Sequence, residues 1–306
     1  MKIGFIGLGK MGFNMSLRLL KNGHKVVCYD VNSTSTKKLA RKGGEAAFSI
    51  EEFINKLSKR KIVWLMLPAG KVTDNMIKEI LPLLKRGDII INGANSFYKN
   101  AEKHNLWCKK RGVYFFDVGV SGGVWGLKNG YPLMIGGPKN QYKYVEPFMK
   151  SLSTKKGYKY FGPAGSGHFV KSVHNIIEYI YLQGIAEGVE LLSKFKHKVK
   201  IDDAFEGWEN SSVVRSWLVE LTTKALRRPD FKKIGTEIGS VTIEELQQTK
   251  KSVKGYAPAF DEAVKIRKSK GRKFKLGKRV ISAVRNEFGG HAVQRIKSKM
   301  RTKGKK

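Results

Sequence analysis

The stretch KIGFIGLGKMG (2–12) decides how the first half of this chain folds. A short apolar run leads directly into GLGKMG (7–12), a G-x-G-x-x-G pattern placed after an expected strand and at the start of an expected helix. In this setting Gly7 permits a tight turn, Gly9 lets the backbone approach a pyrophosphate and Gly12 lets the helix pack closely on the strand. The stretch therefore predicts a dinucleotide-binding unit, with the phosphates on free N–H groups at the helix start.

A second signal for the cofactor ends the next expected strand, KVVCYD (25–30). Asp30 lies in the range of ~20 residues beyond the glycine pattern where an acidic residue can accept hydrogen bonds from both ribose hydroxyls. Its charge would repel a 2′-phosphate, and neither Val31 nor Asn32 supplies an Arg to offset that repulsion. The sequence therefore favours NAD over NADP. The residues expected to hold the cofactor here are Gly7, Leu8, Gly9, Lys10, Met11, Gly12 and Asp30.

Apolar strands alternate with helical patterns over the first part of the chain, which is typical of a parallel sheet covered by helices on both faces. After the glycine-rich segment 161–167, helical patterns dominate. We therefore predict an α/β fold: an N-terminal Rossmann-type doubly wound parallel sheet followed by a second, all-helical domain. Further strands are expected at 61–68, 88–95, 113–120, 131–138 and 158–163, and later helices at roughly 168–195, 201–208, 211–226, 242–252, 258–269 and 276–287.

The composition sets the expected domains and surroundings. A length of 306 residues suits two domains, which we place at 1–163 for the dinucleotide and at 164–292 for substrate and dimer contacts. A basic tail, 293–306, is expected to be disordered. No secretory leader is expected, and the apolar run 62–68 is too short to span a bilayer.

Charge and cysteine content bear on the expected binding partners and the expected cellular location. The 60 Lys and Arg residues against 25 Asp and Glu give a net charge of +35. Because Lys is spread along most of the chain, we favour a solvated basic surface, with steering of small anions as the alternative and nucleic-acid binding as the least favoured. Cys28 and Cys108 are too few for a disulfide framework, so a reducing, cytoplasmic location is expected. We assign no metal site.

The segment HFVKSVHNIIEYI (168–180) combines helical periodicity with an unusual polar face. At ~100° per residue, Lys171, His174, Asn175 and Glu178 fall on one side and the aliphatic residues on the other. Such a pattern is commonest on surface amphipathic helices. A base, an acid, an amide and an imidazole within two turns favour a catalytic face instead.

At this point the chain resembles a known family. GHFVKSVHNIIEY (167–179) is similar to the signature helix GHxVKMVHNGIEY of the 6-phosphogluconate dehydrogenases. The resemblance continues, in the order the family has it, through GLGKMGFNM (7–15), NGANSFY (92–98), DVGVSGGVWG (117–126), SSVVRSWL (211–218) and SAVRNEFGGHAV (282–293), the last being typical of short, often NAD-preferring members.

The resemblance implies an activity: oxidation of 6-phosphogluconate with NAD(P), then decarboxylation to ribulose 5-phosphate, a step of gluconate metabolism in the pentose phosphate pathway. Lys171 would be the general base and Glu178 the acid that protonates C1, while His174 and Asn175 would orient the substrate. Asn95 would touch both nicotinamide and substrate.

The same resemblance implies a substrate pocket for a small phosphorylated sugar acid. Arg285 and His291 would come from a neighbouring subunit, so a homodimer or higher homo-oligomer is expected. The remaining substrate residues would be Ser121, Gly122 and Gly123 around the carboxylate and hydroxyls, with Tyr179, Thr242 and Arg267 at the phosphate.

Two departures from the family pattern bear on the substrate. The family's G[KR]WT segment reads GSVT (239–242) here, so that Ser240 and Val241 replace a cation and a Trp. The family's DGGNS carries Asn92 and Ala94. The competing function is a 3-hydroxyisobutyrate-type dehydrogenase that does not decarboxylate, which would share the nucleotide domain and Lys171 but usually lacks the HNxxEY and RNxFGGH segments.

Overall fold

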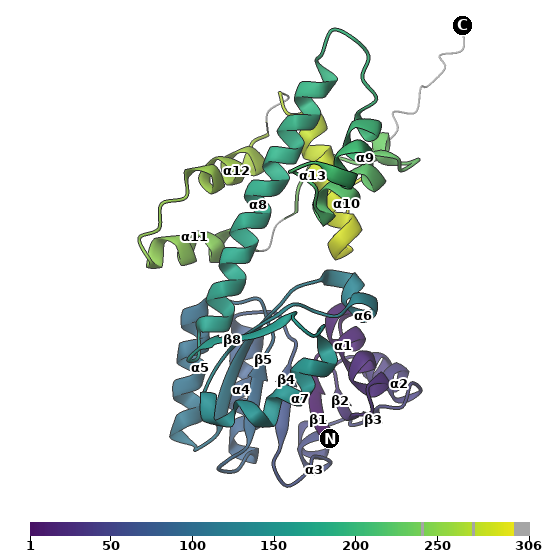
Figure 1. Ribbon diagram of the computed structural model, residues 1–306. Coiled ribbons are helices and arrows are strands. Elements are labelled where there is room, and N and C mark those ends of the chain that lie inside the picture. The colour runs from purple at the N-terminus through teal and green to yellow at the C-terminus, as the bar shows by residue number, and fades with distance from the viewer. Residues whose placement is uncertain (240–241, 271–272, 297–306) are drawn as a thin grey trace, which may run out of the picture. The chain divides into compact units, whose positions relative to one another are not determined.

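Residues 1–239, 242–270 and 273–296 are described by the computed structural model (Figure 1). The chain divides into two compact units, of which unit 1 is Met1–Asn175 with Thr242–Tyr256 and unit 2 is Ile176–Val241 with Ala257–Lys306. Helix α8 (Ser166–Ser193) begins in unit 1 and ends in unit 2. Ser240, Val241 and most of the basic tail lie outside the described residues.

Unit 1 is built on an eight-stranded sheet in the order β3-β2-β1-β4-β5-β6-β7-β8. Neighbouring strands run parallel except at β6 and β7, which pair antiparallel, so β7 and β8 reverse the direction of the first six. The predicted doubly wound parallel sheet is thus confirmed for its first six strands. The strands are β1 (Lys2–Ile6), β2 (Lys25–Tyr29), β3 (Glu45–Ala46), β4 (Ile62–Leu65), β5 (Ile89–Asn92), β6 (Tyr114–Val120), β7 (Leu133–Gly136) and β8 (Tyr158–Gly162).

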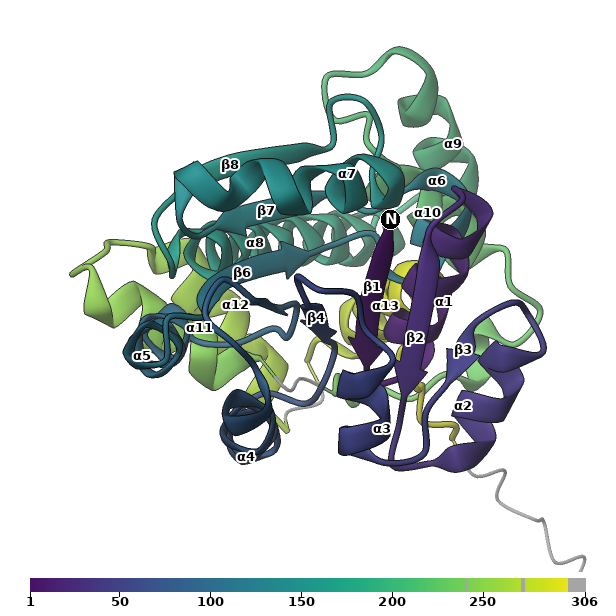
Figure 2. The same cartoon turned by 90° about the horizontal axis from the view of Figure 1, so that it is seen from below.

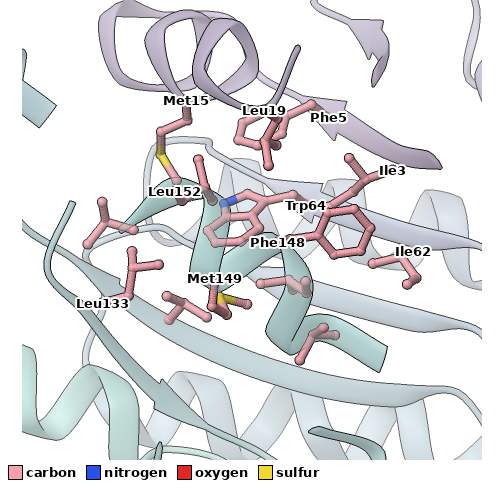
Figure 3. Packing of buried hydrophobic residues seen from close by; sticks show 14 of the residues in the cluster. Ile3, Phe5, Met15, Leu19, Ile62, Trp64, Leu133, Phe148, Met149 and Leu152 are labelled. Atoms are coloured by element: carbon pink, nitrogen blue, oxygen red, sulfur yellow. The ribbon is translucent and has the colours of Figure 1, made fainter. Parts of the chain in front are cut away.

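Helices cover both faces of this sheet because successive strand residues point to opposite sides. Phe5 and Trp64 stack on one face with their ring centroids 5.7 Å apart and pack with α1 and α7 (Figure 3). Ile6 and Val63 join α3, α4 and α5 on the other face (Figure 2). The helices of unit 1 are α1 (Lys10–Lys21), α2 (Ser33–Ala40), α3 (Ile50–Asn55), α4 (Lys71–Ile80), α5 (Tyr98–Lys110), α6 (Gly126–Asn129), α7 (Tyr142–Leu152), the start of α8, and α11 (Ile243–Ser252).

Unit 2 is helical, as predicted, and its described residues form only one isolated β-bridge, between Ile234 and Arg295. Its core joins residues of α8, α9, α10 and α13, including Leu182, Leu221 and Ile281. Beyond α13 the chain folds back, and Gly235 N donates to Gln294 O at 2.7 Å. The helices besides α8 are α9 (Ile201–Ser211), α10 (Trp217–Leu226), α12 (Pro258–Lys268) and α13 (Lys275–Gly289).

Three predicted features of the chain can be checked against the fold. The helix expected over 211–226 starts only at Trp217, because the Ser216 side chain accepts a hydrogen bond from Val219 N and caps the helix there. Cys28 and Cys108 are both buried and unpaired. Within the described part of the chain, every helix is too short or too polar to cross a membrane.

Candidate active site

The turn between β1 and α1 has the shape of a phosphate cradle. Gly7 has a φ of +94°, and a Cβ at Gly12 would lie 1.9 Å from Gly7 O, so both positions need glycine. A Cβ at Gly9 would meet no atom within 4 Å, so this glycine borders open space. Gly9 is also the N-cap of α1 and makes no side-chain cap, which leaves the helix N–H groups available to an anion. The turn therefore fits the pyrophosphate of a dinucleotide.

Asp30 stands beside this cradle at the end of β2. Its Oδ2 accepts a hydrogen bond from Leu8 N at 2.6 Å, and its Oδ1 accepts one from Asn32 N at 2.7 Å. The two donors orient the carboxylate but leave each oxygen a further lone pair, with which it could bind ribose hydroxyls. The neighbouring Val31 is 89% exposed and carries no charge that could offset that of the carboxylate.

The end of β5 carries the loop with Asn92 and Asn95. Asn92 Oδ1 accepts a hydrogen bond from Ala94 N at 3.0 Å, so the amide closes the turn that a carboxylate could also close. A Cβ at Gly93 would lie 2.5 Å from Trp64 Nε1, so the backbone here must approach the Trp64 ring closely. Asn95 is exposed at the tip of the loop, where its amide is free to meet a ligand.

A buried carboxylate that the sequence reasoning missed holds the start of α8. Asp117, within β6, is fully buried, and its two oxygens accept hydrogen bonds from Gly165 N and His168 N, each at 2.7 Å. The negative charge therefore caps the positive end of the helix. A Cβ at Gly167 would lie 2.4 Å from Asp117 O, so the helix packs directly on the strand backbone. The available signals were an Asp inside the apolar run 113–120 and its place at the start of the DVGVSGGVWG motif.

Three of the predicted catalytic residues come together on the first turns of α8. Lys171 is 6% exposed, with its Nζ 3.4 Å from Nδ1 of His174. The same Nδ1 lies 3.1 Å from Oδ1 of Asn175, and Nε2 lies 3.4 Å from the Ser121 hydroxyl. Burial, followed by the charge of Lys171, lowers the pKa of His174 to about 4. The imidazole is therefore neutral near pH 7, and it bridges the lysine to the Ser121 loop.

The amphipathic pattern of α8 is reversed relative to an ordinary surface helix. Lys171 and Asn175 are buried, whereas Val173 is 36% exposed and Ile177 is 59% exposed. The periodicity correctly separated the two faces, and the polar one faces the protein interior in unit 1. This orientation removes the interpretation of the segment as an ordinary surface helix.

Ser121 is placed opposite His174 by a turn rich in glycine. Ser121 N donates to Pro132 O at 3.0 Å where the chain leaves β6. Gly122 and Gly123 follow with φ values of +97° and +53°, a left-handed backbone that other residues rarely adopt. The two glycines therefore turn the chain immediately after the serine.

Unit 2 holds a separate cationic cluster around Tyr179. The guanidinium of Arg267 lies 3.5 Å from the centroid of the Tyr179 ring, and Phe260 packs against the same ring at 5.8 Å. Arg267 is 6% exposed, yet its three nitrogens find no hydrogen-bond acceptor among the described residues. Burial lowers the pKa of Arg267 to about 10, although the nearby Tyr179 opposes that shift. A buried guanidinium of this kind is suited to bind an anion.

Arg285 belongs to the same cluster. It is 7% exposed and donates to Gly239 O of its own chain. Burial lowers the pKa of Arg285, while Tyr179 and Glu178 lie close enough to oppose that shift. Two buried guanidinium groups and one carboxylate thus surround Tyr179 within unit 2.

Of the remaining predicted substrate residues, Thr242 belongs to unit 1 and His291 to unit 2. Thr242 precedes α11 as its N-cap in unit 1. His291 is exposed beyond the left-handed Gly290 that ends α13, with its ring 6.0 Å from that of Phe288. The departures at Ser240 and Val241 fall outside the described residues. Sequence reasoning also missed Glu245, whose carboxylate accepts a hydrogen bond from the Ser172 hydroxyl.

Comparison with known families agrees with this geometry. Residues 2–162 match the NAD binding domain of 6-phosphogluconate dehydrogenase, and residues 167–254 match the C-terminal domain of 6-phosphogluconate dehydrogenase. YqeC of Bacillus subtilis (strain 168) is 36% identical over 301 residues, covering 96% of this chain and 100% of that protein. The NAD(+)-dependent, decarboxylating 6-phosphogluconate dehydrogenase of Haloferax volcanii is 32% identical over 303 residues, covering 96% of this chain and 99% of that protein.

Solved structures share the same architecture. A 6-phosphogluconate dehydrogenase of Plasmodium falciparum, solved in complex with NADP+ and in complex with 6-phosphogluconate, has a TM-score of 0.80 and 30% identity. That match covers 87% of this chain and 61% of the Plasmodium chain. The 3-hydroxyisobutyrate dehydrogenase of Mycobacterium tuberculosis is similar in fold, with a TM-score of 0.76 at 23% identity over 93% of this chain and 99% of that one.

A glycine-rich nucleotide cradle followed by a helical unit defines a dehydrogenase that binds a nicotinamide cofactor. Two family models match this chain, and its relatives exceed 30% identity over nearly its whole length. These matches identify the family. The chain belongs to the 6-phosphogluconate dehydrogenase family.

Proposed function

We propose that this chain oxidises 6-phosphogluconate with NAD and decarboxylates the product to ribulose 5-phosphate and carbon dioxide. The observation that carries the proposal is the buried contact between Lys171 and a neutral His174 on α8. A lysine is an unusual residue to bury, and it serves as a base when its surroundings favour the neutral amine. The nicotinamide, when bound, accepts a hydride from C3 of the substrate.

Lys171 has two tasks in this reaction. The neutral amine first takes the proton from the C3 hydroxyl, so that the alcohol becomes a ketone. The β-keto acid then loses carbon dioxide, and the Lys171 ammonium returns its proton to the ketone oxygen to give an enediol. Glu178 then protonates C1 of the enediol while Lys171 takes back the proton of the enol hydroxyl, which yields ribulose 5-phosphate. Both proton donors therefore act within one turnover.

The residues beside Lys171 hold the substrate in the orientation that these steps need. Asn175 and Ser121 both contact His174, so the imidazole and the amide are fixed before a substrate arrives. We assign the substrate's carboxylate and hydroxyls to Ser121, Gly122 and Gly123 together with His174 and Asn175. Asn95 is exposed and is assigned to both nicotinamide and substrate.

The cofactor is NAD in this proposal because the Asp30 carboxylate stands where the adenosine ribose would bind. Two backbone N–H groups hold it in place, and a 2′-phosphate would meet its negative charge. The ratio of kcat/KM for the two cofactors measures the preference, and a larger value for NADP would refute it.

The phosphate of the substrate is assigned to the cationic cluster of unit 2 together with Thr242. Tyr179, Arg267 and Arg285 are buried together in one chain, so Arg285 serves its own subunit in this proposal, contrary to what the resemblance implies. The exposed His291 remains available to a neighbouring subunit. A buried pair of cations also favours a phosphorylated substrate over a small 3-hydroxy acid.

We also propose that the enzyme is a homodimer or a higher homo-oligomer that works in the cytoplasm. Helix α8 exposes the apolar side chains of Ile177 (59%) and Leu191 (71%), and Phe195, just beyond its end, is 55% exposed. A second copy of the chain would cover these apolar side chains. If so, light scattering should show a smaller oligomer for Leu191→Lys than for the native chain. Two buried, unpaired thiols suit a reducing compartment.

One assay tests the activity. Purified protein is given 6-phosphogluconate with NAD or NADP, and reduced cofactor and carbon dioxide are measured together. We expect them in equal amounts. Absence of turnover with both cofactors would overturn the proposal, and turnover of 3-hydroxyisobutyrate without carbon dioxide would favour the other class of dehydrogenase.

A further inference from the structure

The carboxyl group of Glu245 lies in the interior cluster that contains Lys171, although nothing in the proposed reaction uses it. Glu245 is in the first turn of α11, and its Oε1 accepts a hydrogen bond from the Ser172 hydroxyl at 2.7 Å. Ser172 is fully buried and directly follows Lys171 on α8. The neighbouring Glu244, in contrast, is exposed.

The carboxyl group of Glu245 interacts electrostatically with Lys171. Burial raises the pKa of its carboxyl, while the Ser172 hydrogen bond and the nearby His168 and Lys171 oppose that rise. Three other titratable groups lie at this point, of which His168 has its Nε2 3.2 Å from Asn92 O. His174 contacts Asn175, and the Asp117 carboxylate is engaged by two backbone N–H groups.

We propose that Glu245 is a positioning residue that supplies the counter-charge for the Lys171 ammonium, with Ser172 holding the carboxylate in place. The inference rests on the proposed function, because it concerns the two forms that Lys171 takes during turnover. A buried ammonium without a counter-charge favours the neutral amine. That amine can take the first proton but cannot supply the later one. A carboxylate nearby restores the ammonium, so that both forms become accessible.

The test replaces Glu245 by Gln, which keeps the shape and removes the charge. The charge state of Lys171 is read directly by labelling the substrate-free enzyme with acetic anhydride at a series of pH values and measuring the modified peptide by mass spectrometry. We expect the midpoint of Lys171 labelling to move to lower pH by about one unit or more in Glu245→Gln. The acidic limb of kcat/KM should shift in the same direction.

Glu244→Gln is the matched control, since it removes the same charge from the same turn on the exposed side. We expect its labelling midpoint to remain at the native value. If Glu245→Gln does not fold, Ser172→Ala replaces it, because the loss of the anchoring hydroxyl should give a smaller shift with the same sign. An unchanged or raised midpoint in the folded variant would overturn the proposal.

The labelling also tests the role of Glu245 independently of the proposed enzymatic function. It requires no substrate, so it reports on Lys171 whether or not 6-phosphogluconate is turned over. If the midpoint of Lys171 labelling shifts in a protein that does not turn over 6-phosphogluconate, the proposed function is refuted and the role of Glu245 is supported. A fall in activity and thermal stability with no shift in either pH profile would mean that Glu245 has a structural role only.

Discussion

Gly119 and Lys171 are packed so closely that a methyl group on the glycine would lie 2.4 Å from the lysine Cβ. The glycine is in β6 and the lysine in α8, so this helix rests on the strand backbone. Gly119→Ala should therefore displace Lys171, with a loss of about 1–3 kcal/mol in stability and a fall of at least tenfold in kcat. Thermal melting and steady-state kinetics with 6-phosphogluconate measure the two effects.

Gly207→Ala is the control for this prediction. Gly207 lies inside α9, and a Cβ there would meet no atom within 4 Å. Alanine in a helix interior is favoured over glycine by roughly 0.5–1 kcal/mol, so the melting temperature should rise slightly while kcat stays constant. Equal behaviour of the two alanine variants would contradict the close packing described for Gly119.

Replacement of Lys171 by Met should abolish the chemical step and leave the cofactor bound. The side chain keeps most of its apolar stem but loses the amine that we propose as the base. Fluorescence of bound NADH measures cofactor affinity, and a single-turnover experiment measures chemistry. The exposed Lys150, on α7, provides the control variant Lys150→Met, which should retain full activity. Residual turnover at the native rate in Lys171→Met would reject the assigned base.

Replacement of Asp30 by Asn should change the cofactor preference. The amide retains the size of the carboxylate, so the turn that contains Leu8 and Asn32 can persist, but the repulsion of a 2′-phosphate disappears. We expect kcat/KM for NADP relative to NAD to rise at least tenfold, since two charges about 4 Å apart near a protein surface interact by about 4 kcal/mol. An unaltered ratio would show that the cofactors are distinguished elsewhere.

Replacement of Arg267 by Met should separate stability from substrate affinity. The guanidinium is buried without an acceptor among the described residues, so an apolar side chain there should leave the melting temperature equal or higher. The KM for 6-phosphogluconate should nevertheless rise at least tenfold, while the KM for NAD stays constant. Inorganic phosphate should raise the melting temperature of the native protein and have a smaller effect on the variant.

Arg227→Met is the matched control for the Arg267 variant. Arg227 is 41% exposed in its side chain and pairs with Asp202, Asp203 and Glu206 in the same unit. Its loss should change the KM for 6-phosphogluconate by less than twofold, as expected for an exposed ion pair. A large rise in this KM would indicate that net charge, rather than the buried position, governs phosphate affinity.

The stability of the protein should depend on pH through His174. Its pKa in the folded chain is lowered to about 4, whereas a solvated histidine titrates near 6.5. Between these values the unfolded chain binds a proton that the folded chain does not, so the free energy of unfolding falls as the pH drops through this range. The loss approaches about 3 kcal/mol and is constant at lower pH.

Urea unfolding of the native protein and of His174→Gln at several pH values measures this contribution. Burial also lowers the pKa of His24 and of His104, so only the difference between the two proteins isolates His174. The variant should show the smaller decline between pH ~6.5 and about 4. Parallel curves would mean that the imidazole is not held in its neutral form.

The sequence predicted those parts of the fold that depend on local periodicity. Strand β3 was missed because it is only two residues long, Glu45–Ala46, and has no apolar run. The start of α10 was placed too early, since the capping by Ser216 competes with a continuous helical pattern. The reversal of β7 and β8 could not be read from the chain, because strand direction depends on tertiary pairing.

The residues of the candidate site were predicted only in part. Lys171, His174, Asn175 and Ser121 come together as the motifs indicated. Glu245 was missed because the segment 242–245 also fits a local helix-capping pattern, and nothing in it points to Ser172, far away in sequence. In the structure Thr242 makes no side-chain cap, and the glutamate binds Ser172 instead.

The reversed amphipathic character of α8 has a consequence for how the protein assembles. The first turns of this helix bury Lys171 and Asn175 and expose Val173. Burial of apolar surface therefore contributes little to docking these turns early in folding. They are held by the Asp117 carboxylate of β6 and, at Gly167, by close packing on the backbone of both β6 and β7, so they need the sheet to be in place. We expect this end of α8 to order last during refolding, which pulsed hydrogen exchange would show as late protection of its amides. The enzyme would then acquire its base only when the sheet that supports it is complete.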